Sequence, residues 1–134
     1  MELYVGGRAQ GKLSYVQQAH PGEQMEVIEG SRMVNRMETE GCPEKNVCVV
    51  WNQFHRYVRE HMGQPPAQRE AFVDQVVREL PKLCIISDEV GNGIVPVEAE
   101  ERSYRDEVGR LLCRLAQQAE RMERVICGMG QRIK

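Results

Sequence analysis

Five short apolar segments alternate with helical patterns along this chain, and that alternation constrains its fold more than any other feature. The segments expected as strands are residues 3–5, 25–28, 47–51, 83–86 and 125–127. Helical spacing of apolar residues covers residues 11–19, 31–41, 54–62, 67–80 and 98–122. Strand–helix–strand alternation is typical of a mostly parallel sheet with helices on both faces. We therefore predict an α/β fold with about five strands.

Size and charge narrow the class of protein. With 134 residues, 28% of them charged, the chain is expected to form a single domain over residues 1–134. The net charge is −2 and there is no basic block, which argues against nucleic-acid binding and against binding to anionic membranes. No apolar stretch is long enough to span a membrane, and the N-terminus lacks the pattern of a signal peptide. We expect a cytoplasmic protein.

The cysteines and histidines do not show the spacing of a metal site. The five cysteines are scattered and form no C-x-x-C pair, so we expect no zinc site. Three of them lie in apolar runs and are expected to be buried, reduced thiols: Cys48, Cys84 and Cys127. The three histidines show no metal-ligand spacing and are expected to be surface or hydrogen-bonded residues: His20, His55 and His61.

A glycine-rich turn follows the first expected strand and leads into the first helix. Its sequence from Gly6 to Lys12 matches the Gly-x4-Gly-Lys part of a phosphate-binding P-loop. In that motif, backbone N–H groups at a helix start hold an anion, and the Lys reaches the outer phosphates. The alternative is a turn that merely packs the helix on the sheet. The residues expected to bind a nucleotide are Gly6, Gly7, Arg8, Ala9, Gln10, Gly11, Lys12, Leu13 and Ser14.

Two positions that usually support Mg²⁺ carry other residues. Leu13 occupies the place of the Ser or Thr hydroxyl that completes the motif. Asn52, at the end of the third expected strand, occupies the place of the usual Asp. Ser14 is one residue too late, because one step along a helix rotates a side chain by about 100°. We assign no metal ligand with certainty and do not expect Mg²⁺ to be held in the usual way.

A third polar junction, residues 87–96, follows the fourth expected strand. Its glycines and proline allow a sharp turn, and Asp88 and Glu89 are candidates for a metal ligand or a general base. The alternative is a loop with solvated carboxylates. Because ligands bind at the carboxyl ends of parallel strands, we expect this junction to converge with residues 6–12 and 51–55.

The last third of the chain carries a composite pattern. Residues 88–96 read D-E-V-G-N-G-I-V-P, followed by R-S-Y-R-D over residues 102–106, Gly109-Arg110, and a glycine-bearing end at residues 128–134. With Gly6 to Lys12, this pattern resembles the adenosylcobinamide kinase/adenosylcobinamide-phosphate guanylyltransferase family. The resemblance implies a P-loop NTPase-like fold, GTP or ATP as cofactor, adenosylcobinamide as acceptor, and a homo-oligomer.

The resemblance also implies roles for single residues. Lys12 would neutralise charge on the transferred phosphate, and Glu89 would contact a metal or the acceptor hydroxyl. Arg105 would orient a phosphate or, alternatively, hold the loop through a salt bridge. The positions expected to contact substrate or phosphate are Asn52, Gly91, Gly93 and Arg105.

The chain departs from the family in one internal segment. The family carries a guanylylated His between the first helix and the central strand, whereas here 33 residues separate Lys12 from Asn46 and their one histidine, His20, lies outside any similar motif. We therefore expect a kinase-like phosphotransferase without guanylyltransferase activity. The alternatives are a non-catalytic nucleotide-binding or assembly protein, favoured by Leu13 and Asn52, and a retained fold that binds no nucleotide.

Overall fold

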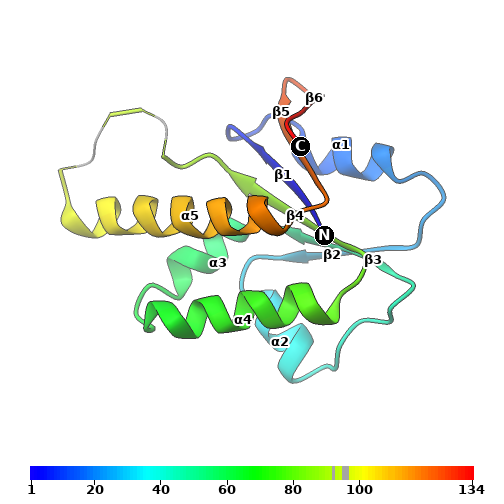
Figure 1. The fold of residues 1–134 in the computed structure, drawn as a ribbon, viewed down its shortest axis with the longest axis horizontal. Coiled ribbons are helices and arrows are strands. Elements are labelled where there is room, and N and C mark those ends of the chain that lie inside the picture. Colours follow the sequence, from blue (N-terminus) through cyan, green and yellow to red (C-terminus); the bar gives the residue numbers. More distant parts are fainter. Residues whose placement is uncertain (92, 95–96) are drawn as a thin grey trace.

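The chain forms one six-stranded sheet with helices on both faces, seen in a computed structural model that describes residues 1–91, 93–94 and 97–134 (Figure 1). The strands are β1 (Glu2–Gly6), β2 (Met25–Glu29), β3 (Cys48–Asn52), β4 (Leu83–Asp88), β5 (Arg121–Ile126) and β6 (Met129–Arg132). The helices are α1 (Lys12–Ala19), α2 (Arg32–Glu38), α3 (Phe54–Glu60), α4 (Pro66–Glu79) and α5 (Ala99–Gln118).

The sheet is parallel over its first five strands in space. The order is β2-β3-β4-β1-β5-β6, and only β6 runs antiparallel, to β5. Helical crossovers connect each of the five parallel strands to the next one along the chain, as a parallel sheet requires. The predicted α/β class and mostly parallel sheet are thus confirmed, with one strand more than the five expected.

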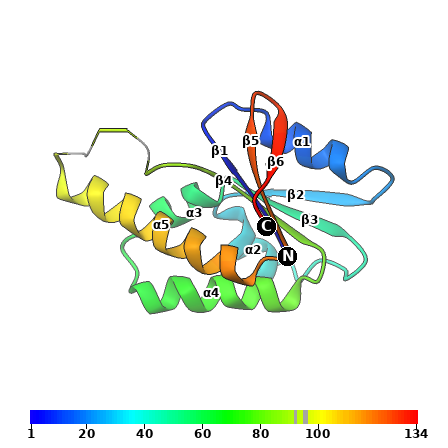
Figure 2. The ribbon, with the colours of Figure 1, turned by 45° about the horizontal axis from the view of Figure 1, so that its top comes forward.

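The two faces of the sheet are covered unequally. Along β1, Leu3 and Val5 belong to the larger core cluster, whereas Tyr4 between them belongs to the smaller one, as the period of two in a strand dictates. The larger cluster includes side chains of α2, α3, α4 and α5. The smaller cluster is covered by α1, which lies alone on its side of the sheet in both views (Figures 1 and 2).

An aromatic group anchors the larger core. Trp51 of β3 is fully buried and meets Phe54, Tyr57 and Phe72 at ring-centroid distances of 5.0, 5.1 and 6.1 Å. Its indole N–H donates to the carbonyl oxygen of Gly30 at 2.9 Å, which satisfies the polar atom that such burial would otherwise isolate. This group fixes the carboxyl end of β3, where one of the polar junctions begins.

The C-terminal region differs from the sequence-based expectation. We expected one helix over residues 98–122, but α5 ends at Gln118, Ala119 is extended, and Met122 lies in β5. The short strand β6 was not predicted, because its four residues are all exposed and show no apolar alternation. Backbone pairing with β5 holds this strand, and such pairing leaves no pattern in the side chains.

Two smaller expectations were also wrong. The helix expected over residues 31–41 is shorter, because α2 covers only Arg32–Glu38. Cys127 is exposed rather than buried, because the chain turns there with a φ of 51° between β5 and β6. Cys48 and Cys84 are buried as expected.

The apolar faces that suggested an oligomer contribute to the core. Val76, Leu111 and Leu115 are buried within the chain, and Phe72 packs against them. The homo-oligomer stays a prediction without support from these residues. In the part of the chain that the structure describes, no helix combines the length and apolar character needed to cross a membrane.

Candidate functional site

A cavity of about 680 Å³ opens at the carboxyl edge of the sheet, within the size range of small-molecule sites. All three polar junctions contribute to it, so the predicted convergence is confirmed. The described residues that line it are Arg8, Ala9, Gln10, Gly11, Lys12, Leu13, Ser14, Asn52, Gln53, His55, Arg56, Arg59, Asp88, Val90 and Tyr104.

The glycine loop, residues 6–12, is shaped by two glycines for different reasons. A Cβ at Gly6 would collide with the backbone carbonyl of Val125 on the neighbouring strand β5. Gly11 has a φ of 79°, a left-handed conformation that glycine adopts without strain, and it directly precedes α1. The loop is also held from the C-terminal side, because the N–H of Gly128 donates to the carbonyl of Gln10 at 2.8 Å.

Lys12 begins α1 and is almost fully buried beneath the glycine loop. Its ammonium group donates to the carbonyl oxygens of Gly7 at 2.7 Å and Gly6 at 3.3 Å. It also pairs with the Oδ1 atom of Asp88 at 2.8 Å. The burial is therefore compensated by three oxygen partners, as a buried charge requires. The ammonium stays at the first turn of the helix, beside the loop that we expect to hold phosphate.

Asp88 joins Lys12 to His55 across two strand ends. The backbone N–H of Asp88 donates to Nδ1 of His55 at 3.1 Å, so the hydrogen of a neutral ring lies on Nε2. Nε2 is 3.4 Å from the Oδ2 atom of Asp88. Burial lowers the pKa of His55, and the nearby Lys12 cation lowers it further against the opposing effect of Asp88. The resulting chain of contacts is a lysine cation, a carboxylate and a neutral imidazole.

Asn52 reaches a carboxylate that the sequence did not point to. Its amide donates to both carboxylate oxygens of Glu29, at 2.9 and 3.2 Å. The two residues lie opposite each other at the ends of β3 and β2. A carboxylate therefore lies beside Asn52, the position where an Asp is usual. This carboxylate is Glu29 of the adjacent strand, and it already accepts hydrogen bonds from Asn52.

Leu13 and Ser14, the two residues after Lys12, also line the cavity. Leu13 is partly buried and packs against the smaller core cluster under α1. Ser14 is exposed on the next helical position. The position after Lys12 therefore carries an aliphatic side chain, and the first hydroxyl of α1 lies one position further on.

The predicted residues of the third junction separate into two groups. Asp88 lines the cavity, whereas Glu89 forms an ion pair with Arg124 at 2.9 Å and is outside the described lining. Gly91 and Gly93 are also outside it. Arg105 donates to the carbonyl of Ile94 at 2.8 Å, which ties the loop to α5 through a backbone oxygen. Asn92, Val95 and Pro96 lie outside the described residues.

Several lining residues come from α3 and α5, and beyond the expected junction 51–55 sequence reasoning missed Arg56, Arg59 and Tyr104. His55, Arg56 and Arg59 project from α3, and the guanidinium of Arg59 lies 3.8 Å from the ring centroid of Tyr104 on α5. The sequence contained part of this information, because the helix expected over residues 54–62 follows directly after a strand. Residues in its first turns could therefore have been placed at the carboxyl ends of the strands. With Arg8 and Lys12, the described lining has four cationic side chains against the one carboxylate of Asp88. This balance favours an anionic ligand.

Comparison with known proteins agrees with the pattern of the last third of the chain. The family model described as cobinamide kinase / cobinamide phosphate guanyltransferase matches residues 9–133. The chain is also similar to the bifunctional adenosylcobalamin biosynthesis protein CobU of Salmonella typhimurium (strain LT2), with 42% identity over 53 residues. That stretch is 40% of this chain and 29% of the relative, so the match spans less than a third of the relative's length. Because the family model covers nearly the whole sequence, the chain belongs to the cobinamide kinase / cobinamide phosphate guanyltransferase family.

Proposed function

We propose that this protein binds a nucleoside triphosphate, GTP or ATP, with its phosphates on the glycine loop. The observation that carries the proposal is the buried Lys12 ammonium at the start of α1, beside a cavity with an excess of cationic side chains. An anion at this position would gain the helix N-terminus, the loop N–H groups and Lys12 together.

Nucleotide binding would exchange partners around Lys12. In the structure, Asp88 neutralises the ammonium at 2.8 Å, and the loop carbonyls of Gly6 and Gly7 hold it in place. A phosphate group would take over part of the role of Asp88, releasing this carboxylate toward the cavity. Asp88 would then be free to contact an acceptor hydroxyl or a cation, the role that the sequence suggested for Glu89.

The reaction that we propose is phosphorylation of the cobinamide hydroxyl, which is the kinase half of the family description. Catalysis would rest on positioning and on charge neutralisation by Lys12. Asp88 would accept the proton of the attacking hydroxyl. Arg59, which lies against the ring of Tyr104 and pairs with Glu101 at 3.0 Å, would bind substrate at the rim.

We further propose that guanylyltransferase activity is missing. His20 belongs to the opposite edge of the sheet, where it contacts Glu2 at the start of β1. His55 does line the cavity, but both of its ring nitrogens face Asp88. Neither histidine is therefore presented to the nucleotide cavity as a free nucleophile.

A second candidate function, non-catalytic nucleotide binding, is favoured by Leu13 and by the occupied amide of Asn52. Leu13 has no oxygen to offer a cation, and Asn52 is already bonded to Glu29. In this case nucleotide would bind without requiring Mg²⁺, and the bound state would serve assembly or regulation.

A kinase assay with cobinamide and labelled GTP or ATP separates the two functions. Measurable phosphate transfer by the unmodified protein, lost in Asp88→Asn with nucleotide binding retained, supports the kinase. No transfer by the unmodified protein, together with a large gain in the double variant Leu13→Ser/Asn52→Asp, supports the non-catalytic function. Guanylylation of the protein by GTP would contradict the missing second activity.

A further inference from the structure

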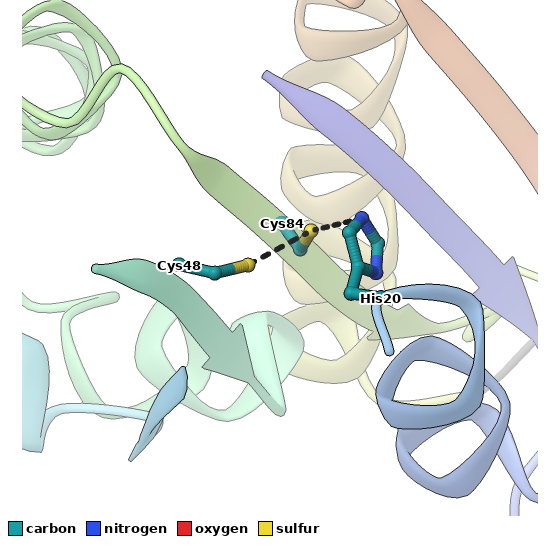
Figure 3. Close-up of side chains that lie close together, drawn as sticks. All are labelled: His20, Cys48 and Cys84. Carbon is teal, nitrogen blue, oxygen red and sulfur yellow. Dashed lines mark hydrogen bonds between the residues drawn. The ribbon is translucent and has the colours of Figure 1, made fainter. Parts of the chain in front are cut away.

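The edge of the sheet opposite the glycine loop gathers four side chains that carry metal-ligating atoms. Glu2 begins β1, Cys48 begins β3, Cys84 is the second residue of β4, and His20 follows α1. Because β3, β4 and β1 are neighbours in the sheet, their amino ends lie side by side. Figure 3 shows Cys84 between Cys48 and His20, with its sulfur in contact with both.

We propose that these four residues form a binding site for a thiophilic divalent metal, with zinc as the matching ion. The proposal does not depend on the function of the glycine loop. Tetrahedral Cys/His/carboxylate sets are typical of zinc sites, and four protein ligands are typical of a structural site.

Four of the six separations among the ligand atoms are close to those around one tetrahedral ion, and the ligand atoms of Cys48, Cys84 and His20 all lie within 4.8 Å of one another. Sγ of Cys48 is 4.0 Å from Sγ of Cys84, which is 3.8 Å from Nε2 of His20. Oε2 of Glu2 is 3.7 Å from Sγ of Cys84 and 3.1 Å from Nε2 of His20. Zinc–ligand bonds of about 2.0–2.3 Å at tetrahedral angles place neighbouring ligand atoms about 3.3–3.8 Å apart. Small shifts of the side chains would therefore suffice to enclose a zinc ion.

The hydrogen bond at the other side of the His20 ring supports a ligand role. Nδ1 is 2.9 Å from the carbonyl oxygen of Val16, an oxygen that can only accept, so Nδ1 carries a hydrogen. In a neutral ring, Nε2 then carries a lone pair, and this nitrogen lies 3.1 Å from the Oε2 atom of Glu2. Two acceptors in this position need a proton or a cation between them. A backbone carbonyl that fixes the ring from behind is the usual outer contact of a metal-bound histidine.

The surroundings also suit a cation and provide access. A cavity of about 200 Å³ reaches the cluster, and its lining includes three carboxylates, from Glu2, Glu23 and Glu120, beside Lys82 and Met1. Cys48 and Cys84 are buried, whereas Glu2 keeps an exposed fraction of 30% and His20 of 13%. The hydroxyl of Tyr4 donates to Glu2 and would orient this ligand.

The absence of a short motif explains why the sequence argued against zinc. The four ligands come from separate segments, and only the strand order brings them together. A bound ion would tie the C-terminal end of α1 to the three central strands. The other end of the same helix carries Lys12, at the glycine loop.

The test uses the full chain, reduced and freed of metal under anaerobic conditions, and titrated with Co²⁺. We expect one equivalent to give the thiolate-to-cobalt charge-transfer band and the visible bands of a tetrahedral site, with zinc then displacing the cobalt. Cys48→Ser and Cys84→Ser should each abolish the charge-transfer intensity or reduce it by about half. The matched control Cys113→Ser, at an exposed cysteine of α5, should leave it unchanged.

Two further measurements keep the test decisive if a core variant fails to fold. His20→Gln, at a partly exposed position, should weaken zinc binding at least tenfold, and His61→Gln should not. In the unmodified protein, zinc should protect Cys48 and Cys84, and no other cysteine, from alkylation mapped by mass spectrometry. Absence of a tetrahedral cobalt spectrum, or equal protection of all five cysteines, would overturn the proposal. A Cys48–Cys84 disulfide forming in the presence of zinc and reductant would overturn it as well.

Discussion

The two ends of the central strands carry opposite kinds of chemistry. At the carboxyl ends of β1, β3 and β4, the ammonium of Lys12, the carboxylate of Asp88 and the neutral imidazole of His55 lie together. At their amino ends, the same strands bring together two thiols, a carboxylate and an imidazole. Helix α1 spans the two, since Lys12 begins it and His20 directly follows it. Strand order determines each site, because neither set of residues is contiguous in sequence.

The largest expected effect comes from a substitution in the glycine loop, at the carboxyl ends of the strands. Gly6→Ala should lower the free energy of unfolding by about 1–3 kcal/mol, because the new methyl group collides with backbone rather than with a movable side chain. It should also displace the glycine loop and abolish nucleotide binding. Denaturant unfolding and nucleotide titration measure the two effects.

The matched control is Gly7→Ala, where the new Cβ would meet the side chain of Gln10 at an ordinary 3.5 Å. We expect a much smaller loss of stability. Equal destabilisation by both substitutions would show that close approach between β1 and β5 does not set the loop.

Lys12→Ala should come next in size. Removing the ammonium takes away a charge-assisted contact to phosphate worth about 2–3 kcal/mol, so nucleotide affinity should fall roughly 30- to 150-fold. Lys45→Ala, at an exposed position away from both sites, should leave affinity unchanged. Equal effects of the two variants in a fluorescence titration would remove Lys12 from the binding site.

The two carboxylates of the third junction offer a sharper distinction. Asp88→Asn should tighten Mg²⁺-free nucleotide binding by roughly fivefold, about 1 kcal/mol, because the competitor for Lys12 is neutralised. Glu89→Gln should change affinity little, since its carboxylate pairs with Arg124 outside the cavity. A larger change in affinity for Glu89→Gln than for Asp88→Asn would contradict this assignment and place Glu89, not Asp88, beside the bound nucleotide.

The pH dependence of the unfolding free energy tests the surroundings of His55 beside the glycine loop. Burial lowers the pKa of His55 below its ordinary 6.5, so the unfolded chain binds the proton more readily than the folded one. The contribution of His55 to stability is therefore complete above pH 6.5 and is lost as the pH falls below that value. The neighbouring charges are Lys12, Asp88, Arg56 and Arg59. Chemical unfolding between pH 8 and 5 should show a smaller loss in His55→Gln than in the His61→Gln control, and identical profiles would contradict it.

The smallest expected effect concerns the independence of the two ends. A five-residue strand separates them by roughly 13 Å, a distance at which energetic effects usually add within about 0.5 kcal/mol. Zinc and nucleotide should therefore raise the unfolding free energy additively. A coupling above 1 kcal/mol would show that α1 transmits strain between the sites.

Much of the fold was predictable from the sequence because its signals are local. The apolar runs of the parallel strands and the turn before Lys12 each occupy a few consecutive residues. The end of α5 was not predictable in this way, because Met122 continues the helical spacing although it lies in β5. The contacts of Asp88 with His55, and of Cys48 with Cys84, depend on strand order and register, which short-range patterns do not contain.

Nucleotide binding at the glycine loop is the central proposal for this protein, and calorimetric titration tests it most directly. The unmodified protein should bind GTP or ATP with one-to-one stoichiometry, and Lys12→Ala should weaken the interaction. At a hundredfold excess over the dissociation constant, the nucleotide should stabilise the fold by about 2.7 kcal/mol. No binding heat and no thermal stabilisation at millimolar GTP and ATP, with or without Mg²⁺, would contradict the account.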